Sequence, residues 1–337
     1  MKFGVIEEHF TNIRTYDFEK VCGNIQNKQY EEEYEIPREN TGTIKNQGSI
    51  NACVACACTQ IAEAIKYVDL IIDELKTKGY SNEDIENLTD DAIFELLQTK
   101  SIEMSEGFFY GALRKENVKS SGMIINQAIE LWKEKGVIPK SYYDLLIEMP
   151  EQQKSINKIP ELFNIAKQYT IGGYAKINYA DKNKKDLAIK QALTQYPRIK
   201  QIPLVAISKN GFSETHCIIL TGWNDKTNSY KFKNSWGSGY ADNGFNEISK
   251  NKINEVYVIF PKELKLPFTD IKESDWFYDE IKHLYFSGLA NGVSDSLFEP
   301  LRSPTRAEMF TLIYRIVKLI DERFEIVNKV INEKLNK

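Results

Sequence analysis

The sequence lacks several features by which the class of a protein is usually recognised. It contains only three histidines in 337 residues, and its five cysteines are an odd number without a framework spacing. Structural disulfides are therefore not expected, and a reducing or anaerobic environment would suit the free thiols. No uninterrupted apolar stretch approaches 18 residues, and residues 1–18 lack the apolar core of a secretory signal. Neither a transmembrane helix nor export by such a signal is expected.

The sequence also has no excess of positive charge. The formal net charge is −4, and no basic cluster with interleaved aromatic residues occurs. Nucleic acid is therefore not expected as a partner. With 42% hydrophobic residues, the chain can bury a full core, and its length predicts two domains or one large domain with an appendage.

The most informative stretch that is present runs over residues 43–60. It carries Cys53, Cys56 and Cys58 directly after the turn-forming residues 46–49. Small and apolar residues then continue without Gly or Pro, which predicts a helix over about 52–78 with Asn51 as its N-cap. Cys53 would lie in the first helical turn, where unpaired N–H groups and the helix dipole favour a nucleophilic thiolate.

The two following cysteines have a simpler interpretation. Cys56 and Cys58 lie among alanines and are expected to act as small core hydrophobes. The alternative is a zinc site formed by Cys53, Cys56 and Cys58. Its C-x2-C-x-C spacing lacks a second matching pair, so no metal is expected.

A nucleophilic cysteine needs a base, and His216 is the candidate. His9 lies near the start of the chain and His283 in its terminal segment, whereas His216 opens an apolar run with the composition of a buried strand. The alternative for His216 is a hydrogen-bonded core histidine. An imidazole that moves a proton needs a partner that fixes its tautomer, and Asn234, with Trp236 beside it, fits that demand.

Four blocks in this order resemble the papain family of cysteine peptidases. They are Gln47-Gly48-Ser49 to Cys53, Thr215-His216, Asn234-Ser235-Trp236-Gly237 and Asp242-Asn243-Gly244-Phe245. The resemblance implies Cys53 as nucleophile, His216 as base, Asn234 as its orienting partner and Trp236 as a supporting residue. It also implies that the Gln47 amide and the Cys53 N–H hold the oxyanion. No metal or organic cofactor is implied.

The chain departs from the family pattern at three points. Ile50 stands where the family usually has a disulfide-forming cysteine, and Val54 replaces an aromatic residue. From position 53 to position 216 is a separation of 163 residues, above the roughly 130 to 150 typical of the family. A charged, helix-prone insertion over residues 77–100 accounts for the excess.

The predicted fold class is α+β. Helices are expected over 52–78, 105–115 and 124–135, followed by strands over 174–177, 203–208 and 215–223, near Tyr230 and over 254–259. The resemblance implies a helical lobe and an antiparallel, barrel-like lobe with the active site between them. We expect the peptidase domain over 37–262.

Residues 1–36 are expected to form an N-terminal lead. It includes a predicted strand over 2–6 and an acidic turn over 31–33. The lead could serve as a short pro-segment or a packing strand. Either this lead or the insertion over 77–100 could cover the active site and restrain the enzyme.

Residues 263–337 have a different sequence pattern from the rest of the chain. They include Thr305-Arg306-Ala307-Glu308, Asp275-Trp276-Phe277-Tyr278 and Phe298-Glu299-Pro300, and together they resemble one S-layer homology (SLH) motif. The resemblance implies an all-helical module that binds an acidic cell-wall polysaccharide. Arg306, Trp276 and Asp270 are the candidate contacts. The alternative for Trp276 is a helix-packing anchor.

The last predicted helix carries an apolar seam of alternating 4 and 3 spacing. Such a seam is typical of a coiled coil, so a homotrimer that supplies three SLH motifs is one hypothesis, and packing of the seam on its own domain is the other. The seam consists of Ile313, Val317, Ile320, Phe324, Val327 and Ile331.

The sequence therefore predicts a bacterial, papain-like cysteine endopeptidase associated with the cell envelope, which acts on protein or peptide substrates. One alternative is a peptidoglycan-directed Cys/His amidase or endopeptidase, and another is a wall-binding protein whose peptidase domain has decayed. The SLH motif indicates a cell-surface or extracellular location. Because no signal is visible, a cytoplasmic or phage-particle location is the alternative. The loop at 121–123 does not define the substrate subsites.

Overall fold

The computed structural model describes residues 16–26, 28–89, 92, 95–96, 102–114, 121–196, 200–261, 265–286, 289–318 and 321. The described residues divide into two compact units. Residues 25–261 form the first unit, and residues 16–24 join 265–318 and 321 in the second. The expected N-terminal lead is thus shared between the two units. The predicted strand at 2–6 and His9 lie outside the described residues.

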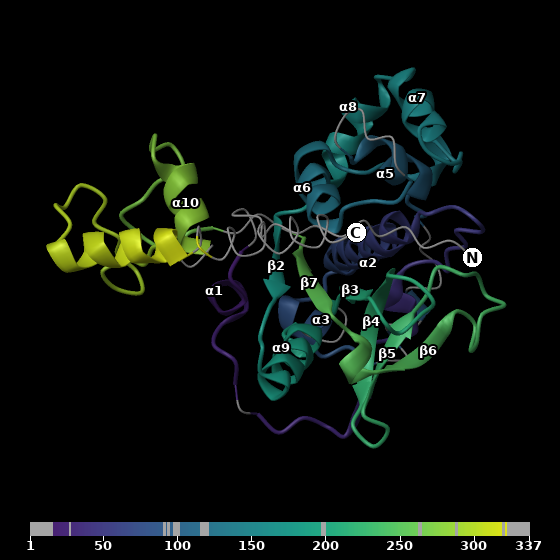
Figure 1. Cartoon of the computed structure of the whole chain (residues 1–337), viewed down its shortest axis with the longest axis horizontal. Coiled ribbons are helices and arrows are strands. Elements are labelled where there is room, and N and C mark those ends of the chain that lie inside the picture. The colour runs from purple at the N-terminus through teal and green to yellow at the C-terminus, as the bar shows by residue number, and fades with distance from the viewer. Residues whose placement is uncertain are drawn as a thin grey trace, which may run out of the picture. The chain divides into compact units, whose positions relative to one another are not determined.

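The first unit is built around the long helix α2 (Cys53–Thr77), which lies between the helical part and the sheet (Figure 1). Helix-favouring residues without Gly or Pro explain its 25 residues. The predicted N-cap was wrong by one residue: Ala52 occupies that position, without a side-chain cap. The Asn51 amide instead donates to the Ser121 hydroxyl at 2.6 Å, since a neighbouring loop offers it a partner.

Further helices cover α2 in the helical part (Figure 1). Ser105 caps α5 by accepting a hydrogen bond from the Phe108 N–H. Gly107 must be a glycine, because a Cβ atom there would stand 1.8 Å from the Leu145 carbonyl oxygen. The helices of this part are α3 (Asn82–Glu86), α5 (Glu106–Ala112), α6 (Ile125–Lys135), α7 (Glu151–Asn157) and α8 (Leu162–Ala166), with 3-10 turns η1 (Arg38–Thr41), η2 (Lys140–Tyr142) and η3 (Lys167–Tyr169).

The sheet is antiparallel throughout its described strands. Their order is β2-β7-β3-β4-β5-β6, and β1 pairs with one end of β4. Helices and an antiparallel sheet confirm the predicted α+β class. The strands are β1 (Glu33–Glu35), β2 (Gly173–Ile177), β3 (Leu204–Ser208), β4 (His216–Asn224), β5 (Ser229–Lys233), β6 (Phe245–Ser249) and β7 (Glu255–Phe260), with α9 (Lys182–Thr194) after β2 and the 3-10 turn η5 (Lys250–Lys252) after β6.

Several elements differ from the sequence prediction, among them α7 and α8, for which no helix was predicted. Residue 33 begins strand β1 rather than ending a solvated turn, because Trp223 anchors this segment through its indole N–H to the Glu31 carbonyl and by stacking on Tyr34. Strand β6 and helix α9 had no predicted counterpart. Only Phe245 and Ile248 of β6 are buried, and α9 is rich in lysine, so neither carries a clear apolar period.

One apolar core joins the two parts of the first unit. Every residue of β4 is buried, because the strand packs on α2 as well as pairing with β3 and β5. Aromatic side chains of α5 and α6 pack edge to face, with 5.7 Å between the ring centroids of Phe109 and Trp132. The nucleophile candidate Cys53 belongs to this same core cluster.

The second unit is small and helical. Helix α10 (Tyr278–Phe286) and a helix over 306–318 are its main elements, and α1 (Phe18–Cys22) packs with α10. Its core consists of Phe268, Ile271, Tyr278 and Ile281. A helix, loop and helix are the arrangement that the sequence predicts here.

The predicted coiled-coil seam is described only at its start. Ile313 and Val317 are 49% and 45% exposed, whereas Ile320, Phe324, Val327 and Ile331 lie outside the described residues. None of the helices among the described residues is long and apolar enough to cross a membrane.

Candidate active site

The sheet brings His216 and Asn234 together. His216 is the first residue of β4, and Asn234 directly follows β5, the antiparallel neighbour of β4. The His216 Nε2 atom lies 2.7 Å from the Asn234 Oδ1 atom. An amide oxygen accepts, so this contact defines His216 as the tautomer that carries its proton on Nε2, and Nδ1 is left as the basic nitrogen.

Aromatic rings enclose this hydrogen bond. The Trp236 ring stacks on the His216 ring with centroids 4.9 Å apart and an interplanar angle of 26°. Phe212 packs edge-on against both rings, at 4.8 Å from His216 and 5.5 Å from Trp236. Phe212 was missed by the sequence analysis, since an aromatic residue in a polar loop carries no pattern.

Burial sets the protonation state of His216. The residue is 0% exposed, and desolvation lowers its pKa to about 4, although the hydrogen bond to Asn234 favours the charged form. The imidazole is therefore neutral near pH 7. A neutral imidazole with an oriented Nε2–H can accept a proton on its other nitrogen.

Asn234 is itself held by the backbone around it. Its N–H donates to the Gly244 carbonyl at 2.9 Å, and its Oδ1 also accepts from the Ser235 N–H at 2.8 Å. Gly244 has a φ of +88°, which a glycine adopts without strain. The block at 242–245 thus serves the orientation of the asparagine.

Gln47 is fixed between the end of β5 and the start of α2. Its Nε2 donates to the Ile50 carbonyl at 2.8 Å, and its Oε1 accepts from the Ser235 hydroxyl at 2.6 Å. Its N–H also donates to the Ser235 carbonyl at 2.9 Å. The side chain is 1% exposed and turns its nitrogen end toward the segment that leads into Cys53.

Cys53 begins α2 and is 0% exposed. Helix α2 packs on β4, the strand that His216 begins. The N–H groups of the first helical turn are not used in intrahelical hydrogen bonds and point away from the helix, toward the side from which a substrate oxygen would approach the sulfur. A helix start, a strand start and two loops therefore supply Cys53, His216, Asn234 and Gln47.

A buried ion network lies behind these residues. Glu63 of α2 is 0% exposed and pairs with Lys45 at 2.6 Å. Its carboxylate also accepts from the Thr43 N–H at 2.6 Å and from the Met104 N–H at 2.7 Å. Lys45 pairs further with Glu106 at 3.2 Å. Although burial lowers the pKa of Lys45, the Glu63 and Glu106 charges raise it above its usual range.

Lys233, the last residue of β5, anchors the loop over residues 41–47. It precedes Asn234, is 1% exposed, and donates from Nζ to the Thr41 carbonyl at 3.2 Å and the Thr41 hydroxyl at 3.0 Å. Burial lowers its pKa to about 7; the Glu63 charge opposes this shift and the Lys45 charge adds to it. Residues 41–47, which carry Gln47, are thus anchored to both α2 and β5. Sequence analysis missed Lys45, Glu63 and Lys233 because single charged residues within helices, strands and loops normally face solvent.

The remaining cysteines of this unit are buried. Cys56, Cys58 and Cys217 are at most 1% exposed, and all three are free thiols. Burial raises the pKa of each well above the usual range of a thiol. No group of three or more potential metal ligands occurs among the described residues, and the zinc alternative gains no support.

Strand β1 of the lead and helix α3 of the insertion lie away from Cys53 and His216 within the first unit. Strand β1 pairs with Gly222–Asn224, six or more residues along β4 from His216, or about 20 Å at strand spacing. In the insertion, Ile85 of α3 packs on Tyr67, Ile71 and Leu75, in the C-terminal half of α2. Neither β1 nor α3 covers the candidate site.

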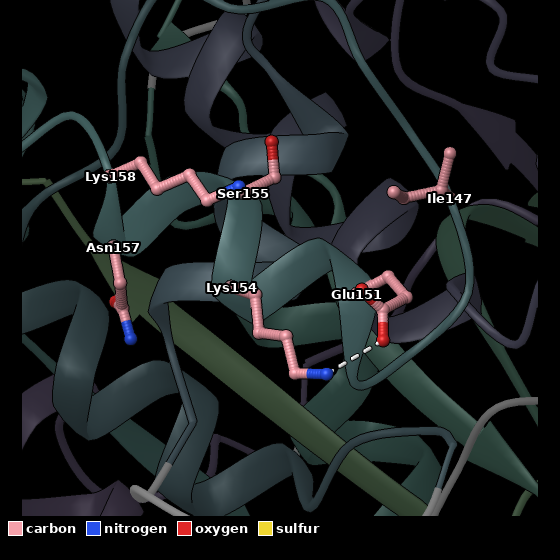
Figure 2. Close-up of a pocket in the computed structure, with 6 residues that line it drawn as sticks. All are labelled: Ile147, Glu151, Lys154, Ser155, Asn157 and Lys158. Carbon is pink, nitrogen blue, oxygen red and sulfur yellow. Dashed lines mark hydrogen bonds and ion pairs between the residues drawn. The ribbon is translucent and has the colours of Figure 1, made fainter.

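One surface pocket of the first unit lies apart from these four residues. A pocket of about 570 Å³ is lined by residues of α7 and its flanks (Figure 2), and its Glu151 and Lys154 pair with each other at 2.8 Å. Cys53, His216 and Asn234 are 0% exposed and Gln47 is 1% exposed, so the site is closed to solvent in this conformation. The six lining residues are Ile147, Glu151, Lys154, Ser155, Asn157 and Lys158.

The candidate polysaccharide contacts of the second unit differ from one another. Trp276 is 87% exposed, although its ring touches that of Phe277. Arg306 begins the helix over 306–318 and is also exposed. Asp270 accepts hydrogen bonds from the Phe298 and Glu299 N–H groups, which lower the pKa of its carboxyl although its slight burial acts the other way. Asp270 thus orders the loop between the helices.

Comparison with solved structures agrees with the architecture. Xylellain, a cysteine protease from Xylella fastidiosa, superposes with a TM-score of 0.52 at 17% identity, over 78% of this chain and 96% of that one. The fold is papain-like. Procathepsin L 3 of the Tenebrio molitor larval midgut gives a TM-score of 0.47 at 14% identity over 74% of this chain and 75% of that one. Curated proteins gave no match.

The C-terminal part matches a sequence family. Residues 267–310 match the family model described as the S-layer homology domain. The match spans α10, the loop ordered by Asp270 and the start of the last helix. The predicted SLH motif is confirmed.

Proposed function

We propose that the papain-like unit is a cysteine endopeptidase. The observation that carries the proposal is the 2.7 Å contact between His216 and Asn234 beneath Trp236, on the strand that packs against the helix begun by Cys53. A buried, neutral imidazole with an oriented tautomer is suited to take the proton of a neighbouring thiol.

The reaction would proceed through a thioester. His216 takes the Cys53 proton, and the thiolate attacks the peptide carbonyl. The Gln47 amide and the Cys53 N–H stabilise the oxyanion, and His216 then protonates the leaving amine. Water hydrolyses the thioester with His216 as base. The buried ion network supports this scheme because it holds the Gln47 loop to both α2 and β5.

The first test is a time course with fluorogenic dipeptide amides, with wild type beside Cys53→Ala. Turnover by wild type alone supports the proposal. Intact-mass spectrometry of the chain detects cleavage within residues 1–36, which would identify the lead as a pro-segment. Because the site is closed in this conformation, a variant lacking residues 1–15 belongs in the panel. Higher activity of that variant supports a covering role for the lead, and unchanged or lower activity contradicts it.

Inactivity of all variants would contradict the peptidase proposal, and the alternatives would then separate by substrate. Cys53-dependent digestion of purified wall peptides would favour a peptidoglycan-directed enzyme, for which the SLH domain is the supporting observation. An unreactive Cys53 would favour the decayed wall-binding protein.

We propose further that the SLH domain attaches the protein to an acidic cell-wall polysaccharide, through the exposed Trp276 and Arg306. Sedimentation with purified cell walls, compared with Trp276→Ala and Arg306→Gln, tests this. Equal sedimentation of all three proteins would contradict it.

A homotrimer through the last helix is supported by the exposed Ile313 and Val317, and a monomeric mass in light scattering would contradict it.

A further inference from the structure

Four of the five thiols gather around the start of α2. Cys53, Cys56 and Cys58 lie in its first turns, and Cys217 directly follows His216 on β4, which packs on α2. A charge on Cys53 raises the pKa of each of the other three, after the larger effect of burial, so all three lie within electrostatic reach of the nucleophile candidate. Cys56, Cys58 and Cys217 have no part in the proposed peptidase mechanism.

Helix geometry selects Cys56 among them. Residues i and i+3 share a helix face, with Cβ atoms about 5–6 Å apart, whereas a disulfide needs about 3.8 Å. Cys56 is three positions after Cys53 and needs a shift of only about 2 Å. Cys58 is five positions after Cys53, which places it about 140° around the helix, on another face.

The position of Cys53 permits this shift. It is the first residue of α2, and its N-cap, Ala52, makes no side-chain cap. The first N–H groups of a helix have no intrahelical partner, so a change of backbone angle at the first residue disturbs fewer helical hydrogen bonds than the same change in the middle of α2. Cys56, whose N–H donates to the Ala52 carbonyl at 2.9 Å, would stay in place.

We propose that Cys53 and Cys56 form a reversible disulfide when a hydroperoxide oxidises Cys53. The Cys53 thiolate attacks one peroxide oxygen, the O–O bond breaks, and the products are a sulfenic acid and water or an alcohol. The Cys56 sulfur then attacks the Cys53 sulfur, and the S–O bond breaks. The leaving hydroxide takes the Cys56 proton and departs as water, so two thiols are oxidised as one peroxide is reduced.

The disulfide would protect the nucleophile. A sulfenic acid with no neighbouring thiol oxidises further to sulfinic acid, which thiol reductants do not reverse. With Cys56 beside it, Cys53 would instead reach a state that dithiothreitol restores. The resulting loss of peptidase activity rests on the proposed function, but the disulfide itself does not.

The experiment treats the reduced full-length protein with a small excess of hydrogen peroxide and then alkylates the remaining thiols. The Cys53–Cys56 link lowers the intact mass by about 2 Da and leaves Cys22, Cys58 and Cys217 to be alkylated after unfolding. Activity is measured before peroxide, after it and after dithiothreitol. Loss and near-complete recovery of activity together with this mass pattern are the expected results.

Variants at the other cysteines show which thiol pairs with Cys53. Cys56→Ala should keep its activity before oxidation but lose it irreversibly in peroxide, with a gain of about 32 Da at Cys53 as sulfinic acid. Cys58→Ala and Cys217→Ala should behave as wild type. Linkage of Cys53 to Cys58 or Cys217, a sulfinic acid in wild type, or a Cys53 that peroxide leaves unmodified would overturn the proposal. A protein that forms the disulfide yet cleaves no peptide when reduced would contradict the peptidase function alone.

Discussion

The two units place their candidate functional residues in opposite ways. In the papain-like unit, Cys53, His216 and Asn234 are 0% exposed and come from segments far apart in the chain. In the second unit, Trp276 is 87% exposed and belongs to one continuous match over residues 267–310. A site that must change pKa values and orient a proton needs burial, whereas a surface that binds a polymer needs access.

The ion pairs of the two units also differ in burial. Glu63 and Lys45 pair while fully buried, and their carboxylate and ammonium groups also accept and donate backbone hydrogen bonds. Glu308 pairs with Arg302 on the surface, and it caps the last helix by accepting from the Thr305 N–H. Removing one partner of a buried pair leaves the other charge buried without a counter-ion. The remaining partner of an exposed pair is instead solvated by water.

The largest expected effect is on catalysis. His216→Ala should lower kcat/KM for a peptide amide by about 10⁴-fold, because it removes the proposed base for the Cys53 proton. Sedimentation with cell walls should not change. A variant with more than a tenth of the wild-type rate would contradict the role of His216.

The next effect is on stability. Glu63→Gln should lower the free energy of unfolding of the first unit by about 3–5 kcal/mol, because it leaves Lys45 without its closest buried partner. Urea denaturation followed by tryptophan fluorescence measures the change. The matched surface variant is Glu308→Gln, which should have a much smaller effect. Equal effects of the two variants would remove the contrast between buried and exposed pairs.

The oxyanion contact should contribute less than the base. Gln47→Ala should lower kcat by about 10²- to 10³-fold with a smaller change in KM, because the contact strengthens in the transition state. Single-turnover kinetics would separate this from slower binding. A change confined to KM would mean that Gln47 positions the substrate only.

The smallest expected effect is a dependence of stability on pH. The pKa of His216 is lowered to about 4 in the folded protein and is about 6.5 when the chain is unfolded. The unfolded chain therefore binds the proton first as pH falls, and stability that is fully present above pH 6.5 is lost toward pH 4. The loss attributable to this group is about 3 kcal/mol. In His216→Asn, stability should vary less over this range, and an unchanged slope would contradict the assignment.

Order along the chain predicted a large part of the first unit. The bounds of α2, α5, α6 and most strands follow from apolar patterns and from Gly and Pro, which act locally. Strand β6 and helix α9 were missed because their burial depends on neighbours that only the sheet supplies. The error at Asn51 has the same cause, since Ser121 is 70 residues away.

The sequence by itself determined the residue types and their order: a thiol at a helix start, an imidazole at a strand start, and an asparagine before a tryptophan. These are local features, and their chemistry is intrinsic to the side chains. Only the tertiary structure decided that His216 meets Asn234 at 2.7 Å, that Phe212 and Trp236 enclose it, and that its pKa falls. It also decided that Lys45, Glu63 and Lys233 are buried around the Gln47 loop. Desolvation and Coulomb interactions depend on distances in space, which the spacing of residues along a chain does not contain.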